Sequence, residues 1–356
     1  MKKRDAKRAT LPPERWEVGG EFHWMGLPPA PFIPWPQAAS WYLLGRHALA
    51  ALLQFLPQGS RRLWLPSYFC FDVADYWRSF VEVATYHDDP RRAEPDWSTL
   101  FPAAADIVIA VNFFGVRSDE TWRLWRERNS CVLVEDHSHD PVSGWALRSN
   151  ADYAFASLRK TVPVPDGAII WSPRGLPLPP SGTAQHAGSA MKLAAMLWKA
   201  EYLEGHTALS AKPVYLKWQR AGEHAFDHSQ VCFVTDLSQQ YVCAGVPLIW
   251  HRRRSTNATF LLSKLRGARK LRPIFTNWPD EAAPLGVVVE FESEADRDAI
   301  RLKLKEHGVY CSVHWPAAKG CSSMARDLAR LLLTLPTDQR YGRNYMERIA
   351  GLILDR

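Results

Sequence analysis

The stretch from residue 131 to residue 170 constrains the fold most, because short apolar runs in it alternate with polar clusters. Residues 131–134, CVLV, are typical of a buried parallel strand, and they lead directly into the polar residues 135–139, EDHSH. A second apolar run, residues 153–156, leads toward Lys160. Ligands of open α/β sheets bind at the C-terminal ends of the strands. The stretch therefore predicts a sheet edge that carries a carboxylate and a lysine.

A carboxylate and a lysine at such an edge suit pyridoxal phosphate (PLP) chemistry. In that chemistry a lysine amine forms a Schiff base with the cofactor aldehyde, and a carboxylate keeps the pyridine nitrogen protonated. Asp136 is the candidate carboxylate, Lys160 the candidate Schiff-base residue, and Ser157 a candidate phosphate ligand. His139 is expected against the cofactor ring or its phenolic oxygen. The spacing alone leaves two alternatives open, with Asp136 as a helix N-cap and Lys160 as a solvated loop residue.

The same stretch resembles the DegT/DnrJ/StrS sugar aminotransferase family of PLP enzymes of fold type I. In that family a strand ends in a Glu-Asp-x-x-Gln/His motif, which residues 135–139 match. The cofactor lysine of the family is followed by a loop that ends in Gly-Gly, and this chain has Gly167 and Ala168 at that offset from Lys160.

The resemblance implies an α/β fold with two unequal parts. We expect a large domain, residues 21–248, with an N-terminal arm and a mainly parallel seven-stranded sheet flanked by helices. Residues 249–356 are expected to form a smaller α/β domain. Residues 1–20 begin with several basic side chains and are expected to be a disordered tail.

Two earlier segments extend the resemblance. The turn GRHAL matches the family's Ser/Gly-Thr-x-Ala-Leu turn, which cradles the cofactor phosphate, and it implies three cofactor ligands, Gly45, Arg46 and His47. The alternative for this segment is a helix start with a surface arginine. The segment LPSYFC matches a family pattern in which an aromatic residue follows and stacks on the cofactor, and that position falls on Cys70.

Two polar residues are candidates for substrate contact. Asn112 follows a buried-type strand, residues 106–111, one strand away from Asp136. His314 stands before Trp315 and a proline, as in a family strand near the substrate mouth. A turn residue is the alternative for Asn112, and a structural histidine is the alternative for His314.

Composition excludes several other classes of protein. The 356 residues are 47% hydrophobic with a mean hydropathy of −0.25, and no apolar run has the length of a membrane span. No signal region is evident, so we expect a cytoplasmic protein. The six cysteines show no Cys-x-x-Cys spacing, which predicts neither a metal site nor disulfides. Lys and Arg exceed Asp and Glu only by 44 to 37, and no nucleic-acid motif is present.

The resemblance implies a PLP-dependent aminotransferase that transfers an amino group from glutamate to a keto sugar nucleotide, in polysaccharide or secondary-metabolite biosynthesis, as a homodimer. Four departures from the family leave a second hypothesis open, a catalytically degenerate relative that acts as a binding or assembly partner. They are Arg46, Cys70, Ala168 and the lack of an Asn-x-Arg segment, in whose place residues 224–228 stand.

Overall fold

The structure is a computed structural model that describes residues 15–354 except 37, 58, 60, 228 and 318–320. Among these residues, seven strands form the central sheet, in the order β3–β9–β8–β7–β6–β4–β5. β4 to β8 are parallel to one another, and β9 is antiparallel to both β8 and β3. The mainly parallel seven-stranded sheet expected from the sequence is therefore confirmed. In chain order the strands are β3 (Ala39–Tyr42), β4 (Arg62–Pro66), β5 (Glu82–Tyr86), β6 (Ile107–Val111), β7 (Val132–Asp136), β8 (Tyr153–Ser157) and β9 (Ala168–Trp171).

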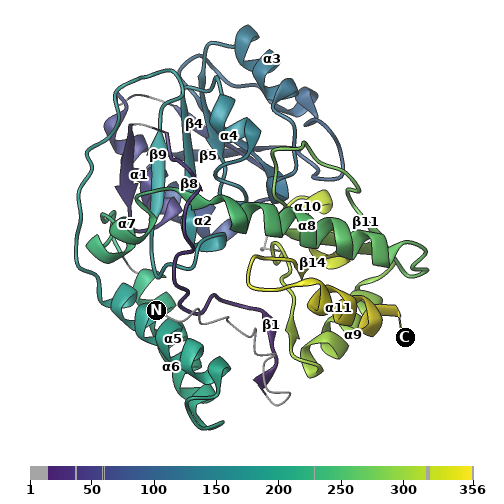
Figure 1. The fold of residues 1–356 in the computed structure, drawn as a ribbon. Coiled ribbons are helices and arrows are strands. Elements are labelled where there is room, and N and C mark those ends of the chain that lie inside the picture. The colour runs from purple at the N-terminus through teal and green to yellow at the C-terminus, as the bar shows by residue number, and fades with distance from the viewer. Residues whose placement is uncertain are drawn as a thin grey trace.

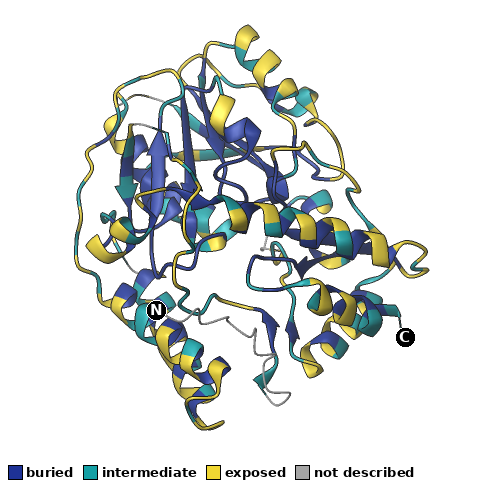
Figure 2. Cartoon of the chain, in the orientation of Figure 1, coloured by how far each residue is buried: buried dark blue, intermediate teal, exposed yellow. Residues whose placement is uncertain are grey.

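Helices cover both faces of this sheet, because apolar residues of a strand alternate between the two faces. Ile109 of β6 packs in a core with α1 (Gly45–Phe55) and α2 (Phe71–Arg78). The neighbouring Val108 packs in a second core with α3 (Glu120–Arg128) and α4 (Gly144–Arg148). The inner strands of the sheet are thus buried, whereas β5 at one edge is partly exposed. Figure 2 shows the buried centre of the sheet in dark blue.

Two long helices, α5 (Ala187–Glu204) and α6 (Ala211–Asp227), form a hairpin that extends away from the central sheet (Figure 1). The short helix α7 (Asp236–Val242) follows. The extended N-terminal arm crosses this region, since β2 (Phe32–Ile33) pairs with β10 (Val246–Pro247). The N-terminal arm implied by the resemblance therefore lies along residues 21–247, which carry the seven-stranded sheet and are called the main sheet domain here.

The remaining chain, residues 248–354, is called the C-terminal lobe here. Its three-stranded antiparallel sheet has the order β11–β12–β14 and packs on α8 and α11. Apolar residues of the strands and of the two helices form one core, with Leu261, Val287 and Ile349 fully buried. The elements of the lobe are α8 (Leu248–Leu265), β11 (Leu271–Pro273), β12 (Gly286–Phe291), α9 (Glu294–Glu306), β13 (Val309–Tyr310), α10 (Ser323–Leu331), β14 (Leu332–Pro336) and α11 (Arg343–Leu354).

The first described residues differ from the prediction of a disordered tail over residues 1–20. β1 (Val18–Gly19) pairs in parallel with β13, and Val18 is fully buried in the core of the C-terminal lobe. Residues 1–14 of the predicted tail lie outside the described residues. No helix of the described chain is long and apolar enough to cross a membrane.

Candidate functional site

A cavity lies at the C-terminal ends of β7 and β8, where the sequence predicts a ligand. Its empty volume is about 690 Å³ with the open mouth included. Asp136 and Ser138 line it from the end of β7, and Ser157 and Lys160 line it from the end of β8. The parallel pairing of the two strands places these four side chains together.

Asp136, and not Glu135, faces the cavity, because successive residues of a strand point to opposite faces. The Ser138 N–H donates to Asp136 Oδ1 at 2.8 Å, which fixes the carboxylate at the cavity wall. Glu135 is fully buried on the other face, where its Oε2 lies 2.9 Å from His137 Nε2. Ser138 Oγ also accepts from the Ser157 N–H at 2.9 Å, which ties the two strand ends together.

Lys160 ends a single helical turn, η4 (Leu158–Lys160), directly after β8. Its Nζ lies 3.3 Å from His139 Nε2. His139 is buried behind Lys160 and is not itself a lining residue of the cavity. Its Nδ1 accepts from the Phe114 N–H at 2.8 Å. Burial, and then the positive charge of Lys160, lowers the pKa of His139 well below its usual value, so the imidazole stays neutral.

The N-terminus of α1 forms another wall. A Cβ on Gly45 would lie 3.0 Å from the Ser157 Cβ, so a side chain here would crowd the close approach of helix and strand. The first amides of a helix attract anions. Arg46 also lines the cavity, and its guanidinium donates to the Phe226 carbonyl at 2.5 Å and lies 3.7 Å from Asp227. The helix start therefore brings positive charge to this end of the cavity.

His47 lies outside the cavity, in contrast to the prediction. Its ring is fully buried, with Nε2 3.1 Å from Ser229 Oγ and with Nδ1 accepting from the Cys232 N–H at 3.3 Å. Burial, and then the positive charge of Arg46, lowers the pKa of His47 to about 4. The neutral ring thus holds the segment after α6 against α1.

Asn112 also lies outside the cavity, although the sequence made it a candidate for substrate contact. It is fully buried, and its side-chain oxygen accepts from the Arg117 N–H at 3.1 Å. Its amide donates to Ser143 Oγ at 3.3 Å. Both ends of the side chain are thus engaged in shaping the turn that follows β6, which was the alternative reading of this residue.

Cys70 lines the cavity at the N-cap of α2, where the resemblance places a residue that stacks on the cofactor. Burial raises the pKa of its thiol. His314 is half-buried behind the cavity, and its Nδ1 lies 2.9 Å from Thr334 Oγ1. Burial, and then the charge of Lys160, lowers the pKa of His314 to about 3. His314 is not a lining residue, whereas its neighbour Trp315 is.

Glu223 and Trp315 line the cavity but were not among the residues predicted from the sequence. Trp315 comes from the C-terminal lobe, and the motif around His314 was the available signal for it. Glu223 comes from α6, and its carboxylate pairs with Arg159, which lines the cavity, and with Lys192 of α5. No pattern in the sequence pointed to Glu223.

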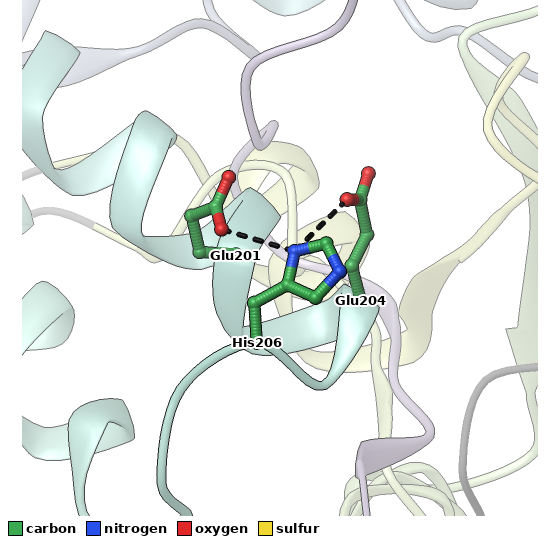
Figure 3. A group of neighbouring side chains, drawn as sticks. All are labelled: Glu201, Glu204 and His206. Carbon is green, nitrogen blue, oxygen red and sulfur yellow. Dashed lines mark hydrogen bonds and ion pairs between the residues drawn. The ribbon is translucent and has the colours of Figure 1, made fainter.

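Away from this cavity, the C-terminal end of α5 gathers three exposed side chains, Glu201, Glu204 and His206 (Figure 3). His206 Nδ1 lies 3.1 Å from Glu201 Oε2 and 3.5 Å from Glu204 Oε2. These atoms lie within 4.8 Å of one another, as metal ligands do. The group is open to solvent on the surface of the helical hairpin, and its contacts are those of exposed ion pairs.

The fold is shared with solved structures of aminotransferases. DesV from S. venezuelae, solved in complex with a ketimine intermediate, superposes with a TM-score of 0.60 at 16% identity, over 91% of this chain and 85% of DesV. A DegT DnrJ EryC1 StrS aminotransferase from Brucella abortus gives a TM-score of 0.56 at 14% identity, over 89% of this chain and 85% of that protein. Spr1654 from Streptococcus pneumoniae is assigned as a sugar aminotransferase and was solved in its PLP form. It gives a TM-score of 0.60 at 14% identity, over 89% of this chain and 86% of Spr1654.

These likenesses confirm the fold expected from the sequence, that of PLP enzymes of fold type I, over nine-tenths of the chain. No family model matches the sequence, and no curated protein matches it either.

Proposed function

We propose that this protein is a PLP-dependent aminotransferase. The observation that carries the proposal is that Asp136 and Lys160 line one cavity together with the N-terminus of α1. A carboxylate, an amine and a helix N-terminus are the three groups that the pyridine nitrogen, the aldehyde and the phosphate of PLP require. The space left by the missing side chain of Gly45 lets the helix start approach Ser157, as a phosphate cradle needs.

Each residue would have a defined task. Asp136 would pair with the ring nitrogen of PLP and keep it protonated, Lys160 would hold the aldehyde carbon, and Gly45, Arg46 and Ser157 would hold the phosphate. Bound PLP supplies an electron sink for the substrate's Cα–H bond. Lys160 Nζ would take the proton from that Cα and return it.

The substrates are proposed on the resemblance and on the neighbours. Spr1654 is assigned as a sugar aminotransferase. We propose glutamate as amino donor and a keto sugar nucleotide as acceptor, in polysaccharide or secondary-metabolite biosynthesis. On the same grounds we propose that the protein is a cytoplasmic homodimer, whose two unequal parts are the PLP-binding domain and the small C-terminal domain.

A degenerate relative without catalytic activity is the second candidate. The observation that favours it is the Glu223 carboxylate, which lines the cavity close to the proposed phosphate ligands and would repel a phosphate. The two candidate functions predict opposite outcomes for PLP binding, so one experiment distinguishes between them.

The experiment is an absorbance titration of the purified protein with PLP, followed by borohydride reduction and peptide mass analysis. We expect a visible band and a reduced adduct on the peptide that contains Lys160. Lys160→Ala should show neither, and Lys217→Ala, which changes an exposed lysine of α6, should behave as the wild type. Failure of the wild type to form a band at saturating PLP would favour the degenerate relative.

A further inference from the structure

The indole of Trp315 is the large aromatic surface that the C-terminal lobe brings to the cavity. It lies in the segment between β13 and α10, yet it lines the cavity formed by β7 and β8. Its ring centroid lies 5.2 Å from that of Tyr68, 5.8 Å from that of Phe69 and 6.3 Å from that of Phe113. The side chain is therefore wedged among aromatic residues of the main sheet domain.

Trp315 also lies beside the reactive end of the cavity. Lys160 Nζ is 5.9 Å from the centroid of the indole. The His139 ring lies 5.9 Å from it at an interplanar angle of 21°. Trp315 is only half-buried, so part of its surface faces open space. The indole therefore borders the same open space as Lys160.

Other aromatic residues nearby are less suited to that task. Tyr68 is 1% exposed and does not line the cavity. Phe69 lines it, but its ring packs against Trp77 at 5.6 Å and against Trp315. Cys70 offers a thiol in place of a ring. Trp77 lines the cavity too, but it is fully buried, whereas Trp315 is half-buried. An indole is the aromatic side chain best suited to a positively charged ring.

We infer that Trp315 stacks on the pyridine ring of PLP and replaces the aromatic contact that Cys70 does not supply. The inference rests on the proposed function and adds a cofactor contact to it. A pyridine ring held protonated by Asp136 is a flat cation, and indole binds such cations best among aromatic side chains. The C-terminal lobe thereby completes the cofactor site, since the main sheet domain alone leaves one ring face to a thiol.

The test compares PLP binding to Trp315→Ala and to Trp315→Phe. We expect the alanine variant to bind PLP roughly tenfold more weakly and to lose most of the visible circular dichroism of the bound cofactor, because the ring is no longer held in one orientation. The phenylalanine variant should retain most of both signals. Trp198→Ala, which removes an exposed tryptophan of α5 (47% exposed), is the matched control.

A second substitution distinguishes stacking from general packing. Adding Cys70→Tyr to Trp315→Ala places an aromatic ring at the position expected from the resemblance, and it should restore PLP affinity and circular dichroism. If the alanine variant does not fold, Trp315→Phe and Trp315→Leu carry the test, since they differ mainly in aromaticity. Equal binding by those two variants, or wild-type binding by Trp315→Ala, would overturn the inference.

The proposed function and this inference fail in different ways. A wild-type protein that forms no visible band with PLP contradicts the proposed function itself. If the wild type forms the band, and substitution of Trp315 changes neither the band nor the affinity for PLP, only the stacking role is contradicted.

Discussion

Arg159 and Glu223 form an ion pair at the wall of the cavity, so the residue next to Lys160 is tied to α6. Lys192 Nζ donates to the same carboxylate oxygen of Glu223 at 2.5 Å. Cations from η4 and α5 therefore converge on a carboxylate of the protein. The attraction of Arg159 and Lys192 outweighs burial and lowers the pKa of Glu223.

This ion pair predicts a competition between Glu223 and the phosphate of PLP. Glu223→Gln should tighten PLP binding about threefold to tenfold, because Arg159 becomes available to the phosphate and one repelling charge is removed. Lys192 keeps Glu21 as a partner, so the substitution leaves no buried cation unpaired. The measurement is the dissociation constant of PLP beside that of pyridoxal, which lacks the phosphate. An equal change for both ligands would contradict the prediction.

Asp136→Asn should separate cofactor binding from catalysis. Asparagine can still accept from the Ser138 N–H, so PLP binding should change by a few-fold only, but the negative charge beside the ring nitrogen is lost. We expect the reaction with glutamate to slow by about 100-fold or more, since an unprotonated ring is a weaker electron sink. Single-turnover absorbance measures this rate. Asp72→Asn, at an exposed aspartate of α2, is the control, and similar rates for both variants would refute the assignment.

Gly45→Ala should weaken the phosphate end of the cavity. The added Cβ would lie 3.0 Å from the Ser157 Cβ and would push the first turn of α1 away from the end of β8. We expect a stability loss of about 1–2 kcal/mol and weaker PLP binding. Gly26→Ala is the matched control, because no described atom lies within 4 Å of a Cβ at that position. Urea unfolding and PLP titration measure the two effects, and identical behaviour of both variants would exclude a tight contact at Gly45.

His47 should make the free energy of unfolding depend on pH. In the folded protein its pKa is about 4, whereas in the unfolded chain it is near 6.5. Below pH 6.5 the unfolded state binds a proton that the folded state does not bind, so stability falls as the pH falls from about 6.5 toward 4. His47→Gln should reduce this slope by about 1.4 kcal/mol per pH unit. Urea unfolding at pH 7, 6 and 5 measures it, and parallel pH profiles of variant and wild type would contradict the prediction.

The fold was predictable because the order of apolar runs and polar clusters along the sequence gives the order of the strands and of their polar ends. Asp136 and Lys160 each end a short apolar run, and the ends of neighbouring parallel strands must meet at one edge. The sequence cannot give side-chain direction with the same ease. Successive helical residues point about 100° apart, so Gly45 and His47 cannot both face one cavity. The Asn112 side chain accepts a hydrogen bond from the Arg117 N–H, and this contact depends on the exact path of the turn.

Two of the cavity residues that the sequence did not reveal come from distant parts of the chain. Glu223 reaches the cavity from α6, and Trp315 reaches it from the C-terminal lobe. Such contacts depend on how separate elements pack, and neither periodicity nor local spacing reports that. The resemblance to the family pointed to His314 and missed its neighbour Trp315. A matching motif identifies a segment near the site, but it does not show which side chain of that segment enters the cavity.

The pairing of β1 with β13 has a consequence for synthesis on the ribosome. Val18 is made long before its partner Val309, because the two residues lie far apart along the chain. The C-terminal lobe therefore cannot complete its core until α11 has been made, while the strands of the seven-stranded sheet all lie within residues 39–171. The strands of the seven-stranded sheet can pair early, whereas β1 has no partner strand until β13 has been made, as expected of a contact with very large sequence separation.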